Sequence, residues 1–285
     1  MKNITRKPEW IKVQLPTQKP YFKIKELIKS HKLNTVCEEA ACPNRGECWS
    51  QGTATFMILG NICTRSCGFC NVITGKPTEL DTEEPQRVAK ATQTLNLKHV
   101  VITSVNRDEL ADGGAQIWAQ TILETRQLNP DTQIEVLIPD LKGNSKALKV
   151  IFATKPDILN HNIETVPRLY NTVRPQANYE QSLNVLSLAK TYNLTTKSGI
   201  MLGLGETKDE VEKVLTDLRK HKVDLITIGQ YLQPTQNHLP VARFIHPDEF
   251  NYYREYGLSI GFSNVFSGAL VRSSYHAFEQ ANQLT

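Results

Sequence analysis

From residue 54 onward, short apolar runs alternate with amphipathic stretches along the chain. The runs are aliphatic or β-branched and mostly unbroken by polar residues, which is typical of strands covered on both faces. They predict strands at Thr55–Leu59, His99–Thr103, Gln133–Ile138, Ile158–His161, Thr196–Leu202 and Leu225–Gln230. The amphipathic stretches predict helices at Pro85–Leu95, Gln116–Arg126, Ser145–Ala153, Glu180–Tyr192 and Asp209–His221. This alternation indicates a parallel sheet with crossover helices.

Six strand–helix units, with none obvious beyond them, favour an α/β fold of the incomplete (β/α)6 barrel type over a complete eight-stranded barrel. A doubly wound sheet is the alternative, because periodicity alone does not separate the two. We expect a cysteine-bearing N-terminal extension at 1–53, the partial barrel at 54–240, and a helix (Pro247–Tyr256) and tail within 241–285. These parts are expected to form one structural unit, since a barrel of this length is routinely one domain.

In barrels of parallel strands, reactive residues lie at the carboxyl ends of the strands and in the loops that follow. This rule selects segments that are mostly polar or glycine-rich, at 63–70, 104–114, Asp140, 162–164, 203–206 and 230–233. One rim of the barrel is therefore expected to carry the chemistry.

Composition narrows the function classes. The chain is 40% hydrophobic and 22% charged, and no window approaches the ~18 consecutive apolar residues of a membrane-spanning helix. The polar segment Met1–Trp10 lacks the apolar run of a signal peptide, so a cytoplasmic protein is expected. A net charge of +4, with scattered Lys and Arg, is too weak for a nucleic-acid-binding surface but suits acidic protein partners.

The cysteines carry more information than the composition does. All six lie between Cys37 and Cys70. A disulfide framework is normally spread through a small secreted domain, where it compensates for a weak core. Thiols concentrated near one end of a large chain indicate metal binding instead.

The second group of cysteines is Cys63-x3-Cys67-x2-Cys70, which follows an apolar run and is expected in a loop that leaves a strand. Three thiolates this close can surround one soft metal centre, and Gly68 allows a tight turn. A cubane cluster has four irons, so three cysteines leave one iron free for a substrate or cofactor. A zinc site that borrows a ligand such as His99 is the alternative, but zinc sites prefer paired C-x2-C elements.

The first group, Cys37-x4-Cys42-x5-Cys48, lies in the N-terminal extension. By itself it could also bind a structural zinc or form a redox disulfide with a spare thiol. The second group, with Phe69 before its last cysteine, resembles the signature of the radical S-adenosylmethionine superfamily. Both groups together with the string RSSY at 272–275 resemble the lipoyl synthase family specifically, and the resemblance covers nearly the whole chain.

The resemblance implies S-adenosylmethionine and two [4Fe–4S] clusters. The implied ligands are Cys63, Cys67 and Cys70 for the cluster that binds S-adenosylmethionine, and Cys37, Cys42, Cys48 and Ser273 for an auxiliary cluster. Ser274 is the alternative serine ligand. A serine oxygen is a harder iron ligand than a thiolate, so that iron would be the easiest to lose.

The reaction that the resemblance implies is insertion of two sulfur atoms at C6 and C8 of an octanoyl chain on a lysine of a lipoyl carrier protein. Acid–base groups are too weak to break such C–H bonds, so the cofactor supplies the radical and the protein supplies orientation. A 5′-deoxyadenosyl radical would abstract hydrogen, and the auxiliary cluster would donate sulfur and be consumed. The chain would then be a sulfurtransferase with no catalytic side chain of its own.

The candidates for binding S-adenosylmethionine are Asn71, Glu164, Arg174, Gln230 and Leu232. Glu164 would hydrogen-bond the ribose or the amino group, and Arg174 would pair with the carboxylate. Backbone groups of 230–232 would contact adenine. Each has a structural alternative, such as a surface ion pair for Arg174 or a cap for Glu164. The candidates on the substrate side are Ser104, Asn106, Arg107 and Asp108.

The implied partners are octanoylated lipoyl carrier domains (H protein and the acyltransferase subunits of 2-oxoacid dehydrogenases), ferredoxin or flavodoxin as electron donor, and iron–sulfur assembly proteins. Another radical S-adenosylmethionine enzyme with an auxiliary cluster is the alternative, and it should not need the RSSY serine. A structural or storage zinc protein is the alternative outside catalysis. It would be colourless, whereas two clusters give a brown protein with about eight irons.

Overall fold

The computed structural model describes residues 7–12, 19–50, 53, 55–275 and 277. Its main sheet has eight strands in the order β1-β2-β5-β6-β7-β8-β9-β10. The order follows the sequence and never reverses, whereas a doubly wound sheet reverses at its switch point. The sheet is therefore an open, partial barrel, as predicted.

The predicted strands are all present, with a shift of at most one residue at one end. They are β2 (Thr55–Ile58), β5 (His99–Ser104), β6 (Gln133–Leu137), β7 (Ile158–Asn160), β8 (Thr195–Leu202) and β9 (Leu225–Gln230). Neighbouring strands of this series pair in parallel. Their carboxyl ends therefore share one rim.

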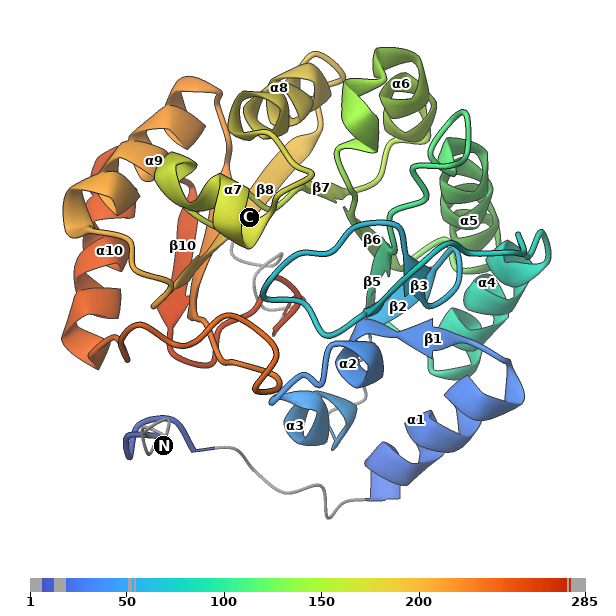
Figure 1. The fold of residues 1–285 in the computed structure, drawn as a ribbon. Helices are drawn as coiled ribbons and strands as arrows, with labels where there is room; N and C mark the ends of the chain where they lie inside the picture. The colour runs from blue at the N-terminus through green and yellow to red at the C-terminus, as the bar shows by residue number, and fades with distance from the viewer. Residues whose placement is uncertain (1–6, 13–18, 51–52, 54, 276, 278–285) are drawn as a thin grey trace.

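The crossover helices lie along the outer side of the curved sheet (Figure 1). They are α4 (Glu84–Thr94), α5 (Ala115–Leu128), α6 (Ser145–Ala153), α8 (Tyr179–Lys190), α9 (Lys208–Lys220) and α10 (Pro247–Ser259). Helix α9 shows how the sequence sets such an element. Thr207 and Glu210 form a capping box at its start, and one apolar stripe, Val211 to Leu218, is buried against the sheet side.

The sheet is extended at both edges by residues outside the barrel repeat. Strand β1 (Asn34–Thr35) pairs antiparallel with β2, and β10 (Asn264–Gly268) pairs in parallel with β9. The sequence prediction of only a helix and tail after residue 240 missed β10. Its residues NVFSG show no apolar run and only Val265 is buried, so pairing with β9 makes it a strand.

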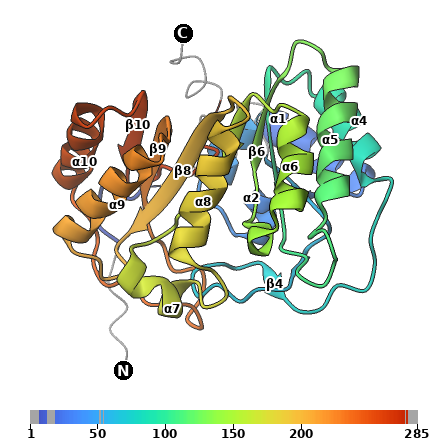
Figure 2. The same ribbon diagram turned by 90° about the horizontal axis from the view of Figure 1, so that it is seen from above.

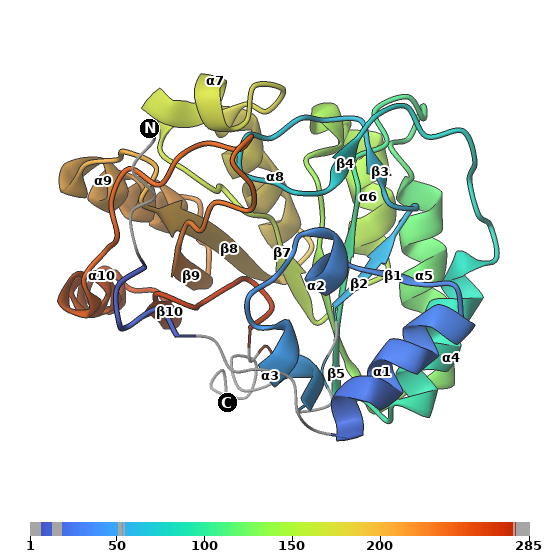
Figure 3. The ribbon, with the colours of Figure 1, turned by 60° about the horizontal axis from the view of Figure 1, so that its bottom comes forward.

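The N-terminal elements α1 (Lys19–Ser30), α2 (Val36–Glu39) and α3 (Arg45–Ser50) precede the barrel. Helices α2 and α3 lie between the β1 edge and the β10 edge of the curved sheet (Figures 1 and 3). A small second sheet pairs β3 (Ile62–Cys63) with β4 (Ile73–Thr74).

Figure 2 shows β4 and the short helix α7 (Tyr170–Val173) at the same end of the barrel. That end is the rim where the parallel strands finish. No helix within the described ranges is long and apolar enough to span a membrane.

Candidate metal centres

The loop after β2 carries the second group of cysteines. Its three thiols are free and half-buried. The Cys63 sulfur accepts hydrogen bonds from the backbone N–H of Asn106, at 3.4 Å, and from that of Arg65, at 3.5 Å. Burial raises the pKa of Cys67, and it raises the pKa of Cys70 to about 12 with help from the neighbouring cysteines. A metal centre that binds these thiols must therefore displace their protons.

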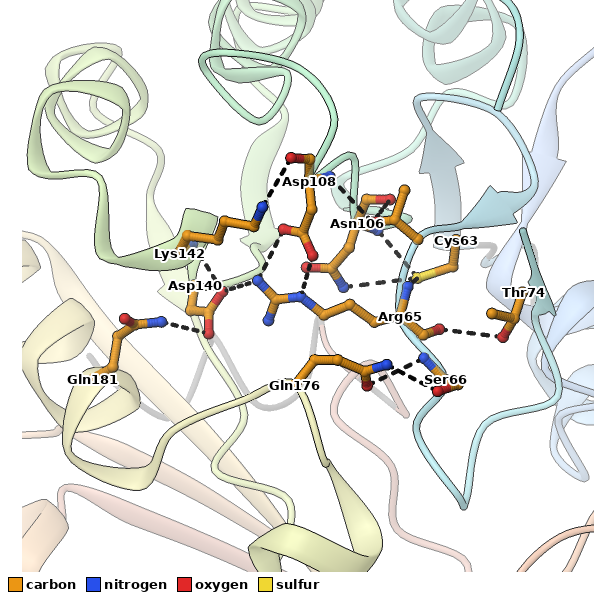
Figure 4. Close-up of polar contacts among 11 residues, drawn as sticks. Cys63, Arg65, Ser66, Thr74, Asn106, Asp108, Asp140, Lys142, Gln176 and Gln181 are labelled. Atoms are coloured by element: carbon orange, nitrogen blue, oxygen red, sulfur yellow. Dashed lines mark hydrogen bonds and ion pairs between the residues drawn. The ribbon is translucent and has the colours of Figure 1, made fainter. Parts of the chain in front are cut away.

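Arg65, inside this cysteine loop, ties the loop to the ends of two strands (Figure 4). Its Nε donates to Asp108 Oδ2 at 2.7 Å, and its Nη2 lies 2.7 Å from Asp140 Oδ1. Burial acts to raise the pKa of Asp140, but the hydrogen bond and charge of Arg65 outweigh it and lower that pKa to about 2. Gln181 donates a further hydrogen bond to Asp140 at 2.7 Å. The clamp fixes the loop before any ligand is bound.

The four substrate-side candidates fall into two groups. Ser104 Oγ is buried and has no hydrogen-bond partner within the described residues, and Asn106 contacts Cys63. Arg107 and Asp108 hold the loops instead. Arg107 donates to the carbonyl of Leu59 at 3.0 Å and also pairs with Glu109, while Asp108 binds Arg65. A contact of either residue with substrate stays a prediction.

Glu164 and Arg174 lie close to the same cysteine loop. Glu164 has a left-handed backbone, with φ of 66°, and accepts a hydrogen bond from Asn162 Nδ2 at 3.0 Å. Arg174 Nη1 donates to the Asn162 carbonyl at 3.0 Å, while its buried Nε has no partner in the described part of the chain. Burial raises the pKa of Glu164 and Arg174 opposes the rise. Both charges also act on Cys67.

The other predicted cofactor contacts have different surroundings. Asn71 Nδ2 donates to the Glu39 carbonyl at 3.1 Å and so joins the two cysteine segments. The buried Gln230 side chain donates to carbonyl groups of its neighbours and accepts from the Ile245 N–H at 2.7 Å. That amide is fully used within the protein, which gives it a structural role. Leu232 is partly buried, and a backbone contact from 230–232 stays a prediction.

The first group of cysteines meets the C-terminal string in one pocket. Its lining comprises Val36, Cys37, Cys42, Asn44, Cys48, Thr53, Thr55, His99, Val101, Arg272, Ser274, Tyr275 and Ala277. Two contacts join these distant segments: Asn44 Nδ2 donates to the Leu270 carbonyl at 2.6 Å, and Tyr275 OH donates to Glu47 at 3.0 Å. Burial raises the pKa of Cys37 to about 11.

The two serines of the string point to different neighbours. Ser274 lines the pocket with the three cysteines. Ser273 does not line it, and its Oγ shares hydrogen bonds of 2.7 and 3.0 Å with Asn162. The geometry therefore favours Ser274 over the predicted Ser273 as the oxygen that could join Cys37, Cys42 and Cys48. In the sequence, the two serines differ only in their order, so no residue pattern could show which of them faces the cysteines.

Each donor set offers three free thiols, and thiolates are the usual protein ligands of an iron–sulfur cluster. No group of three or more His, Cys, Asp or Glu side chains within the described ranges could hold one metal ion. A cluster is several atoms across, so its thiolates stand further apart than the ligands of one ion. His99, the possible fourth zinc ligand, is bound to Glu135 and Gln133 at 3.3 Å each. A zinc site gains no support here.

The sequence of the chain is similar to known protein families. Residues 57–218 match the model of the Radical SAM superfamily, and residues 1–42 match that of the N-terminal domain of lipoyl synthase of the Radical SAM family. The lipoyl synthase of Rubrobacter xylanophilus is 58% identical over 276 residues, which span 96% of this chain and 86% of that protein. The lipoyl synthase of Laribacter hongkongensis is 55% identical over 98% of this chain and 90% of its own length. A mitochondrial lipoyl synthase of Nematostella vectensis is 55% identical over 95% of this chain and 94% of its own.

Solved structures show the same fold at low identity. Streptococcus suis SuiB bound to S-adenosylmethionine has a TM-score of 0.61 at 10% identity, covering 83% of this chain and 56% of that one. Methylornithine synthase has a TM-score of 0.55 at 14% identity, covering 91% and 86%.

Proposed function

Because the chain belongs to the lipoyl synthase family of radical S-adenosylmethionine enzymes, we propose that it inserts two sulfur atoms, at C6 and C8, into an octanoyl group on a lysine of a lipoyl carrier protein. One observation carries the proposal beyond the fold. The N-terminal cysteines and the C-terminal string, more than 200 residues apart in the sequence, line one pocket that is separate from the second cysteine group. A radical enzyme without an auxiliary cluster has no need of that pocket.

The residues that would hold the clusters follow from the two sites. The cluster that binds S-adenosylmethionine would be held by Cys63, Cys67 and Cys70, and the auxiliary cluster by Cys37, Cys42, Cys48 and Ser274. When bound, these groups would supply the electron that activates S-adenosylmethionine and the sulfur that enters the product.

The protein's own residues bind and orient. Arg65 holds the cysteine loop against the ends of β5 and β6 through Asp108 and Asp140. Glu164 and Arg174 present opposite charges beside Cys67, which suits the amino and carboxylate groups of an amino-acid cofactor. Ser104, at the end of β5, has a buried hydroxyl with no partner among the described residues and is a candidate on the substrate side.

The partners follow from this chemistry. They would be octanoylated lipoyl carrier domains, a ferredoxin or flavodoxin and iron–sulfur assembly proteins, with no nucleic acid or membrane involved. A cytoplasmic location would suit this chemistry, because reducing compartments keep thiols available for metal binding.

The test is an anaerobic assay of an octanoyl-lysyl peptide with reconstituted protein, S-adenosylmethionine and dithionite, read by mass spectrometry. The wild type is expected to add two sulfurs and to release two 5′-deoxyadenosines per product. Ser274→Ala is expected to form 5′-deoxyadenosine but little sulfur product, while Ser273→Ala keeps more of the sulfur insertion. If the wild type forms 5′-deoxyadenosine but adds no sulfur, the superfamily assignment stands and the proposed sulfur insertion is refuted.

A further inference from the structure

The C-terminal string enters the barrel interior beside a buried ion pair. Lys197 on β8 and Glu135 on β6 both have fully buried side chains, and Lys197 Nζ lies 2.8 Å from Glu135 Oε1. The same ammonium donates to the backbone carbonyl of Ser273 at 2.6 Å. A lysine this deep in a barrel is unusual, and one of its donors is used on the string itself.

Side chains from two further strands contact the Glu135 carboxylate. Asn160 on β7 donates to Glu135 Oε1 at 3.2 Å, and His99 Nε2 on β5 lies 3.3 Å from Glu135 Oε2. Burying two charges is costly, and apolar residues of similar volume often stabilise a core at least as well. A contribution to stability is therefore a weak explanation for this ion pair. The hydrogen bond that Lys197 donates to the Ser273 carbonyl is a more specific one.

Two strand glycines leave room for the string. A Cβ at Gly229 on β9 would overlap the Val271 carbonyl oxygen. One at Gly199 on β8 would lie 2.7 Å from Asn162 Oδ1 and Thr227 Oγ1, and 3.1 Å from Ser273 Oγ. Glycine inside a strand commonly marks the close approach of another backbone. Neighbouring strands are thus shaped around residues 271–273.

The carbonyl of Ser273 belongs to the peptide unit that ends at the Cα of Ser274. That unit is planar, so fixing its oxygen fixes the plane from which the Ser274 side chain departs. We propose that Lys197, supported by Glu135, is a positioning residue that holds Ser274 toward the auxiliary cluster. This inference rests on the proposed function, because Ser274 has a ligand to meet only if that cluster binds.

The test measures the auxiliary cluster alone, in the full chain with Cys63, Cys67 and Cys70 replaced by alanine. Five proteins are compared: this parent, Ser274→Ala, Ser273→Ala, the pair variant Lys197→Met/Glu135→Gln, and the combination of Ser274→Ala with the pair variant. The readout is the rate at which the first iron passes to a chelator. The remaining [3Fe–4S] cluster is then oxidised by one electron with ferricyanide and detected by its EPR signal. The pair variant removes both charges together, which avoids leaving a lone buried carboxylate.

The pair variant is expected to lose its first iron about tenfold faster than the parent, since a charge-assisted hydrogen bond is lost. Adding the pair change to Ser274→Ala is expected to give no further acceleration, because the position of an absent ligand is irrelevant. Ser273→Ala keeps the carbonyl and should match the parent.

Three results would overturn the inference. They are a pair variant as slow as the parent, effects of the pair and of Ser274→Ala that multiply, and a Ser273→Ala protein as labile as Ser274→Ala. A parent that binds no cluster on its N-terminal cysteines would refute the proposed function as well, so the two failures are distinguishable. Lys197→Met/Glu135→Leu repeats the comparison in an apolar interior if the first pair variant does not fold.

Discussion

The clamp of Arg65 on Asp140 gives a prediction whose size follows from the structure. Asp140→Asn keeps the shape of the side chain but removes the charge that Arg65 contacts at 2.7 Å. Both side chains are buried, with exposed fractions of 3% for Arg65 and 0% for Asp140, so water does not screen the pair. The change is therefore expected to weaken both the fold and the cysteine loop.

The magnitude comes from the pKa of Asp140, which is lowered from an ordinary 3.8 to about 2. At ~1.36 kcal/mol per pKa unit, this corresponds to about 2 kcal/mol of stability above pH 4. A lowered pKa means that the folded chain holds the proton less tightly than the unfolded one. The contribution is therefore complete above the unfolded pKa and is lost as the pH falls from about 4 towards 2.

Urea unfolding followed by circular dichroism measures the difference. At pH 7, Asp140→Asn is expected to lower the free energy of unfolding by about 2 kcal/mol, and the gap should close in acid. Glu210→Gln is the matched control. The pKa of Glu210 is also lowered to about 2, mainly by its hydrogen bond with Arg168, but that partner is 55% exposed. Its loss should have a much smaller effect.

Equal losses for Asp140→Asn and Glu210→Gln, or a gap for Asp140→Asn that persists at pH 2, would refute this reasoning. Either result would mean that the buried geometry around Arg65 does not determine the strength of the clamp.

Three other changes test separate parts of the structure. Gly229→Ala would place a methyl group on the Val271 carbonyl, so iron content is expected to fall from about eight towards about four per chain by colorimetric assay; an unchanged content would contradict the placement of the string. Burial raises the pKa of Glu84 to about 7, so the wild type loses stability as the pH rises through 7, and Glu84→Gln is expected to be up to about 3 kcal/mol more stable at pH 8. Urea unfolding at pH 5 and pH 8 checks this, and a gain that is no larger at pH 8 would count against it. Arg174→Met is expected to weaken S-adenosylmethionine binding at least tenfold by calorimetry; unchanged affinity would leave Arg174 with its backbone contacts alone.

The fold was predictable because the barrel repeat is local. Buried strands such as Ile158–Asn160 and capped helices such as Lys208–Lys220 can be predicted from their own residues and the residues that flank them. Strand β10 was missed because its pairing with β9, rather than its own pattern, makes it a strand.

The site could be predicted only where the spacing of residues in the sequence indicates a metal centre. The two cysteine groups were evident from their intervals, but partners brought together by the fold were not. Nothing in the local sequence distinguishes Ser274 from Ser273, or shows that Arg107 contacts Leu59 and Glu109. Lys197 lies inside a predicted strand, and only the fold shows that its ammonium contacts the carbonyl of Ser273.

The central claim is that the auxiliary cluster between the N-terminal cysteines and Ser274 supplies the sulfur. The most direct measurement reconstitutes the protein with sulfide of a heavy sulfur isotope, removes all free sulfide, and determines the mass of the octanoyl-lysyl product after a single turnover. The account predicts two heavy sulfurs in the product and loss of the auxiliary cluster signal. A product that contains only light sulfur, or an auxiliary cluster that survives turnover intact, would contradict it.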